Sequence, residues 1–124
     1  MDRNEIKTLR PELFIENSDS TSSIELFQNE VLRPVIKFQH DLIIHLVTAH
    51  PLFAPVTNNK GPRLQFQKRV KDLISGQSTL KNQLIGSIVG LLTEEEISYY
   101  TVNSNELNKR IHGMICQRVA DTLY

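Results

Sequence analysis

The sequence is poor in the residues on which many common functions depend. It has one cysteine, Cys116, no tryptophan and 6% aromatic residues in a chain of 124. A single cysteine excludes an intramolecular disulfide and a cysteine-built zinc site, and it suits a reducing compartment. The scarcity of aromatic rings removes the usual stacking platforms for sugars and single-stranded bases. We therefore expect a cytoplasmic protein whose core needs no disulfide.

Long apolar runs are also missing. No segment has 18 consecutive apolar residues, and the first residues contain no apolar stretch of signal-peptide length, so we expect no membrane association. No alternating pattern indicates a strand. A hydrophobic content of 40% is nevertheless enough to bury one core in a chain of this size.

Residues 24–50 have the apolar spacing of one long amphipathic helix. Ser22 and Glu25 match a capping box at its start. Pro34 deletes an amide donor and crowds the carbonyl of Glu30, so we expect a kink at Pro34. A straight helix of this length would extend about 40 Å, more than a small bundle covers, and its apolar stripe predicts a homodimer that self-associates through 24–50. The predicted apolar side comprises Ile24, Phe27, Val31, Val35, Phe38, Leu42, Leu46 and Ala49, flanked by Leu32, Ile36 and Ile43.

Further helices follow a proline-rich loop at 50–62. The pattern predicts helices at 62–75 and 78–92, and the second of these is apolar around most of its circumference, as expected for a central helix. Thr93 and Asn103 are each followed three residues later by Glu, which predicts capping boxes for a short acidic helix and for the last helix. The predicted fold is all-α, a bundle of four main helices plus one short helix.

The first residues lack a clear helical period. We expect 1–23, which ends in the polar run ENSDSTSS, to be a flexible N-terminal segment and linker that folding does not require, and 24–124 to be a single helical domain. Gly86 and Gly90 lie four residues apart in the predicted central helix. This spacing predicts a tight helix crossing inside the bundle.

Three polar residues fall inside apolar arcs and are the candidate ligand-binding residues: Gln28, Gln39 and Arg118. A buried polar group needs a partner, so each implies a hydrogen bond, a polar cavity or an interface. For Arg118, three alternatives stay open. Its head can reach solvent past the helix end, pair with Asp41 or an acid of 94–96, or bind a carboxylate or phosphate ligand. Convergence of the three residues on a cavity would favour a ligand, whereas dispersal on an apolar face would favour a subunit contact.

The spacing of the histidine, cysteine and aspartate residues gives little indication of a metal site or a catalytic site. Three histidines are spaced by five residues, which places them on different sides of a helix: His40, His45 and His50. The pairs Asp41 with His45 and His112 with Cys116 share helix faces, but each supplies at most two ligands. We expect no metal, no cofactor and no catalytic residues. A small metal- or cysteine-dependent enzyme stays the alternative and would require these four residues to converge.

Charge is distributed unevenly along a chain of zero net charge. Residues 1–30 carry seven acids and three bases, 31–92 carry eight bases and two acids, and 93–124 carry five acids and three bases. The basic middle could bind an anion or could neutralise the acidic ends within the fold. Its resemblance to a helix-turn-helix fails because polar residues fall where that motif needs apolar ones. We do not expect specific nucleic-acid binding, and weak binding is a further alternative.

Two groups of short segments resemble a family of short, uncharacterised, all-helical bacterial proteins. The resemblance spans residues 24–119, implies a compact helical fold, and carries no established site residues. Some members of that family are labelled glyoxalase. The matching segments are Phe27-Gln28-Asn29, Leu32-Arg33-Pro34, Lys37-Phe38-Gln39, Asp41-Leu42, Asn103-Ser104 and Leu107-Asn108-Lys109-Arg110. Together with the patterns above, it favours a small soluble interaction or small-ligand-binding module that is homodimeric.

Overall fold

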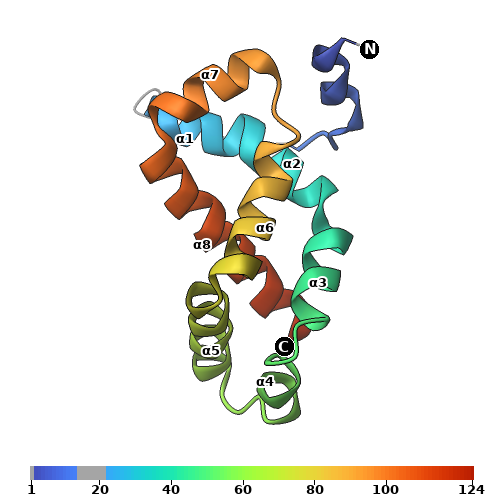
Figure 1. The fold of residues 1–124 in the computed structure, drawn as a ribbon, viewed down its shortest axis with the longest axis vertical. Helices are drawn as coiled ribbons and strands as arrows, with labels where there is room; N and C mark the ends of the chain where they lie inside the picture. Colours follow the sequence, from blue (N-terminus) through green and yellow to red (C-terminus); the bar gives the residue numbers. More distant parts are fainter. Residues whose placement is uncertain (1, 14–21) are drawn as a thin grey trace.

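Every regular element in the described part of the chain, residues 2–13 and 22–124, is a helix in the computed structural model (Figure 1). The all-α prediction is therefore confirmed. In chain order the elements are the 3-10 helix η1 (Arg3–Leu9), α1 (Ser23–Phe27), the π-helical turn η2 (Gln28–Leu32), α2 (Arg33–Phe38), α3 (His40–Thr48), α4 (Ala54–Asn58), α5 (Arg63–Gly76), α6 (Ser78–Val89), α7 (Glu94–Val102) and α8 (Ser104–Leu123).

The segment expected to be one helix at 24–50 is divided into α1, η2, α2 and α3. In η2 the backbone N–H of Arg33 bonds to the carbonyl of Gln28, five residues back. Pro34 then occupies the first turn of α2, where a missing N–H costs little. A second interruption, which the sequence pattern did not indicate, lies at Gln39 with φ −86° and ψ 10°. In Figure 1 the chain crosses the molecule through α1 and α2 and then turns along α3.

This division changes which side of the segment is buried. Phe38 and Leu42, predicted to face the core, are 45% and 41% exposed. The prediction was wrong at these two positions and at the exposed Ala49, because the π turn and the interruption at Gln39 rotate later residues away from a constant step of about 100° per residue. The buried apolar residues of the segment are Val35 of the predicted side, Leu32, Ile36 and Ile43 of its predicted flanks, and Val47, which was not predicted.

The centre of the fold is α8, whereas the sequence pattern favoured 78–92. α8 contacts η2, α3, α5, α6 and α7. One apolar side of the 20-residue helix supplies six buried residues to the core: Leu107, Ile111, Ile115, Cys116, Val119 and Ala120. α6 buries only one side, through Leu80, Leu84 and Ile88. On one side α8 packs against η2 and α3, and on the other it packs against α5 and α6.

Helix ends follow the predicted signals in part. α5 ends at Gly76 as predicted, and the capping box of Thr93 and Glu96 is formed at the start of α7. The box predicted at Asn103 is absent, because Asn103 turns its Nδ2 to the carbonyl of Tyr99 and does not cap α8. The expected loop at 50–62 contains the short helix α4.

The predicted tight crossing at Gly86 and Gly90 is also wrong. Apart from its own helix backbone and chain neighbours, a Cβ added at Gly86 would meet no atom of the described residues within 4 Å, so no other helix in this part of the chain approaches it. Both glycines are exposed, because α6 turns a different side toward the core.

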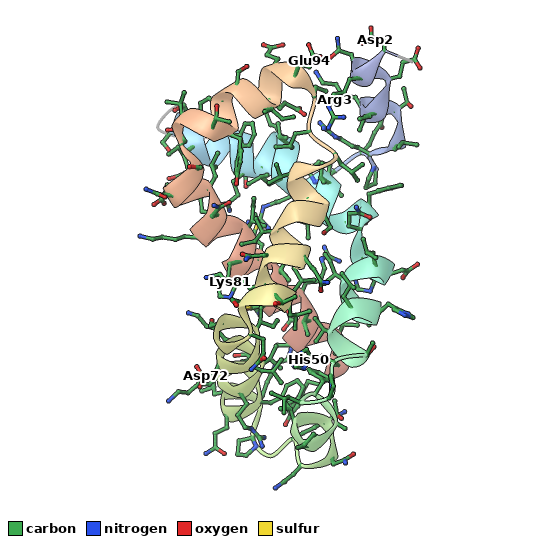
Figure 2. All side chains as sticks on the ribbon, viewed as in Figure 1. Asp2, Arg3, His50, Asp72, Lys81 and Glu94 are labelled. Carbon is green, nitrogen blue, oxygen red and sulfur yellow. The ribbon has the colours of Figure 1, made fainter. Side chains whose placement is uncertain are left out.

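The described part of the N-terminal segment contacts the body of the protein. Arg3 donates from Nε to the carbonyl of Leu92 and from Nη2 to the carbonyl of Gly90, both at 2.8 Å. Figure 2 shows Arg3 between η1 and the connection from α6 to α7. Residues 14–21, which include most of the predicted linker, lie outside the described residues.

Candidate functional site

Arg118, on the α2 side of α8, is half-buried and faces a histidine. Its Nη1 lies 3.1 Å from Nδ1 of His40. A guanidinium can only donate, so Nδ1 of His40 is the acceptor in this contact. Arg118 makes no ion pair within residues 2–13 and 22–124, and Glu96, one of its predicted partners, binds Arg10 instead. The guanidinium therefore keeps most of its five donors for other groups.

The other two candidate residues connect helices. Oε1 of Gln28 accepts a hydrogen bond of 2.8 Å from Nη1 of Arg110 on α8. Nε2 of Gln39 donates to the carbonyl of Ser87 on α6 at 3.0 Å. Both side-chain amides thus have a hydrogen-bond partner within the fold, as a buried polar group requires. The structure does not bring them together with Arg118 at one cavity.

Arg118 does line a cavity, which lies between α2 and α8. The volume is about 620 Å³, and we call it the α2–α8 cavity. Three cationic side chains line it: Arg33, Lys37 and Arg118. Three apolar side chains line it too: Leu13, Ile36 and Met114. The cavity therefore combines positive charge with apolar surface, a combination that suits an anion carrying a hydrocarbon group.

One acid, Asp121, lies at this cavity, and its charge is already matched. Hydrogen bonds from Gln117 and then from Arg63 lower the pKa of Asp121 below its ordinary value. The carboxylate is therefore ionised near neutral pH, and Arg63 balances it at 3.1 Å. The three cations of the cavity are left without an acidic partner among the described residues.

The alternative function, a metal- or cysteine-dependent enzyme, would require its ligands or catalytic residues to lie together, and the described residues do not form such a site. No three His, Cys, Asp or Glu side chains lie together as possible metal ligands in the described part of the chain. His112 and Cys116 do meet, with Nε2 and Sγ 3.5 Å apart. Burial, however, raises the pKa of the Cys116 thiol to about 11, so the sulfur is protonated and weakly nucleophilic at neutral pH.

Several cations of the basic middle block are used inside the fold. Lys60 donates to the carbonyl of Tyr124, and Arg69 donates to the carbonyl of Lys60. Arg63 pairs with Asp121. Internal neutralisation, one of the two interpretations of the charge pattern, thus accounts for Arg63 among the described residues, whereas Lys60 and Arg69 meet neutral carbonyl groups. The remaining cations include Lys71 and Lys81.

The functional contacts that sequence reasoning missed involve His40 and the two N-terminal arginines, Arg3 and Arg10. Arg3 and Arg10 lie more than 80 residues away from their partners in sequence. The capping box did identify Glu96, but nothing in a local pattern could identify an arginine at that distance. His40 could have been identified only if the interruption at Gln39 had been known.

Comparisons with protein-family models, curated proteins and solved structures give no match to this chain. The resemblance of residues 24–119 to a family of short bacterial proteins therefore stays a prediction. Within the described residues, no helix is both long enough and apolar enough to cross a membrane.

Proposed function

We propose that this protein binds a small carboxylate that carries an apolar group, in the α2–α8 cavity. The observation that carries the proposal is Arg118, a half-buried arginine whose only hydrogen-bond partner among the described residues is His40. No acid among the described residues pairs with this guanidinium, so its charge is unmatched within that part of the fold. An anion in the cavity would supply the opposite charge through charge-assisted hydrogen bonds.

The chemistry of the lining favours a carboxylate over a purely inorganic anion. A guanidinium matches a carboxylate with two parallel hydrogen bonds. Arg33 is held in place by a 2.9 Å bond from its Nε to Oδ1 of Asn29, so its remaining donors are oriented in advance. Leu13, Ile36 and Met114 offer apolar surface to a hydrocarbon group. The volume of about 620 Å³ is typical of small-ligand sites.

The test is a titration with octanoate, followed by the shift in thermal midpoint. Octanoate should stabilise the parent chain, and octylamine, which has the same tail and the opposite charge, should not. Arg118→Met should leave the unliganded protein within about 0.5 kcal/mol of the parent, since it leaves no acid among the described residues unpaired. It should weaken octanoate binding about tenfold or more, the range of a charge-assisted hydrogen bond.

Lys68→Met is the matched control for this titration. It also removes one positive charge, but Lys68 is an exposed residue of α5 that does not line the α2–α8 cavity. Octanoate should bind this variant as it binds the parent. Equal midpoint shifts for the parent and Arg118→Met would exclude Arg118 as the anion site and overturn the proposal.

We also propose that the chain is a homodimer that pairs through the end of α2 and the start of α3. The observation in favour is the exposure of Phe38 and Leu42, which lie four residues apart. Lys37 and Asp41 flank them, are exposed, and make no ion pair within the described residues. In a two-fold contact Lys37 of one copy would face Asp41 of the other, so the patch is complementary to itself.

The scaffold that we propose for this function is one bundle with four main members: the run from α1 to α3, α5, α6 and α8. Mutual contacts among α3, α5, α6 and α8 support it. We further propose that Pro34 kinks the first member through η2, and that α7 is the short fifth helix. The single buried cysteine agrees with the cytoplasmic location proposed for this chain.

A further inference from the structure

A second cavity, distinct from the first, opens where α5, α6 and α8 meet. Its volume is about 480 Å³, and we call it the lysine cavity. Each of the three helices contributes one lysine: Lys71, Lys81 and Lys109. His112, Asn105 and Asn108 complete the polar lining, and no carboxylate is among the lining residues. Figure 2 shows Lys81 near the start of α6, close to α5.

The three lysines are not neutralised by the fold. None of them makes an ion pair within residues 2–13 and 22–124. Other cations of the same sequence block, such as Arg63, do have partners. Like charges that converge on one cavity repel one another, and the repulsion disappears when an anion binds between them. The geometry is therefore unfavourable when the cavity is empty and favourable when an anion occupies it.

His112, which lines the cavity, has a pKa that responds to this positive charge. Burial is the first cause that lowers the pKa of His112, and the charges of Lys81 and Lys71 lower it further. Nε2 of His112 lies 3.2 Å from Oγ of Ser75, which fixes the ring against α5. His112 is thus a built-in probe of the charge in the cavity.

The remaining polar groups are also arranged as donors. Oδ1 of Asn108 accepts a 2.6 Å hydrogen bond from the hydroxyl of Tyr100, so the amide nitrogen of Asn108 keeps its two N–H groups. Each lysine ammonium adds three N–H donors. A group with several acceptor oxygens and a double negative charge is the natural complement of such a donor set.

We infer that the lysine cavity binds the phosphoryl group of a small phosphorylated molecule. This inference is independent of the carboxylate proposed for the α2–α8 cavity, since the two cavities share only Gly113 among their lining residues. Free phosphate and a phosphomonoester offer the same chemistry to the three lysines. A volume of about 480 Å³ suits a small molecule.

The experiment follows the ring resonances of His112 by NMR while inorganic phosphate is added. Phosphate should bind saturably and raise the pKa of His112, because it cancels the charges of Lys71 and Lys81. Lys71→Gln and Lys109→Gln, both at exposed positions where folding is not at risk, should each weaken phosphate binding about tenfold.

Lys68→Gln provides the matched control. Lys68 and Lys71 are exposed lysines three residues apart on α5, but only Lys71 lines the lysine cavity. Phosphate should bind Lys68→Gln as it binds the parent. Equal weakening by Lys68→Gln and Lys71→Gln would show general charge screening, and an unchanged pKa of His112 at saturating phosphate would place the anion elsewhere. Either result overturns the inference.

Two further titrations identify the source of the phosphoryl group. Glycerol 3-phosphate that binds more tightly than inorganic phosphate would indicate a phosphomonoester, and equal affinity would indicate free phosphate. Both outcomes support the site. A twelve-nucleotide single strand that displaces phosphate, with an affinity that rises with strand length, would instead show a polyanion surface and would overturn the small-molecule inference.

Discussion

Arg10 and Glu96 form a two-pronged ion pair between residues 86 positions apart in sequence. Nη1 and Nη2 of Arg10 lie 2.8 Å and 2.6 Å from the two carboxylate oxygens of Glu96, and both side chains are about nine-tenths buried. Nη2 also donates to the carbonyl of Leu91 at 3.0 Å. Glu96 in turn accepts the N–H of Thr93 within the capping box. The N-terminal segment is thus attached to the start of α7.

This pair predicts that the N-terminal segment contributes to stability, contrary to the expectation from its composition. Arg10→Met should cost about 3 kcal/mol, because it leaves the carboxylate of Glu96 buried without its cation. Urea denaturation measures the loss. Lys7→Met, which removes an exposed charge from the same η1 helix, should stay within about 0.5 kcal/mol of the parent. If Arg10→Met costs as little stability as Lys7→Met, then the contact of the N-terminal segment does not contribute to folding.

The same pair predicts a dependence of stability on pH. Burial alone would raise the pKa of Glu96, but the hydrogen bonds from Arg10 and Thr93 outweigh it and hold the pKa below the ordinary 4.5. A carboxylate with a lowered pKa in the folded state contributes stability above its ordinary pKa and loses it as the pH falls through the folded value. The parent should therefore lose stability over a pH window that begins near the ordinary pKa of 4.5 and extends below it.

Glu96→Gln tests the assignment of this acid transition. The variant should be less stable than the parent at neutral pH, and the difference between the two should shrink as the pH falls through the window above. Free energies of unfolding at several pH values give that difference directly. A difference that does not change with pH would assign the acid transition to other carboxylates.

The open space around Gly86 predicts that replacing this glycine with alanine stabilises the protein. A glycine inside a helix costs about 0.5 to 1 kcal/mol relative to alanine, and nothing lies within 4 Å of a Cβ at this position. Gly86→Ala should therefore stabilise the protein by that amount. At Gly90 the added Cβ would lie 3.1 Å from the carbonyl of Gly86, so Gly90→Ala should gain less or lose stability. Destabilisation by Gly86→Ala would point to a partner that covers this side of α6.

The proposed dimer predicts a charge-reversal pattern. Sedimentation of the unmodified chain at micromolar concentrations should show a dimer. Lys37→Glu or Asp41→Lys alone should weaken it, because each places like charges opposite one another in the two-fold contact. The double variant should recover part of the affinity, since the two charges are merely exchanged. A strictly monomeric parent chain would contradict the proposal.

Local sequence pattern alone was sufficient to predict the all-α class and the positions of several helix ends. The apolar periodicity of 62–75 and 78–92 corresponds to α5 and α6, and the box of Thr93 and Glu96 begins α7. These features depend on residues within a few positions of one another, so they can be read along the chain. The candidate ligand residue Arg118 was also found in this way, as a polar residue inside an apolar arc.

Only the tertiary structure decided what each polar residue meets. Arg118 faces His40, Gln39 reaches the carbonyl of Ser87, and Arg10 reaches Glu96, each across a gap of many residues. A period of 3.6 residues describes a straight helix, so it could not follow the π turn before Pro34 or the interruption at Gln39, which expose Phe38 and Leu42. The convergence of three lysines on one cavity is decided by helix packing, because contacts between α5, α6 and α8 join residues that share no local pattern.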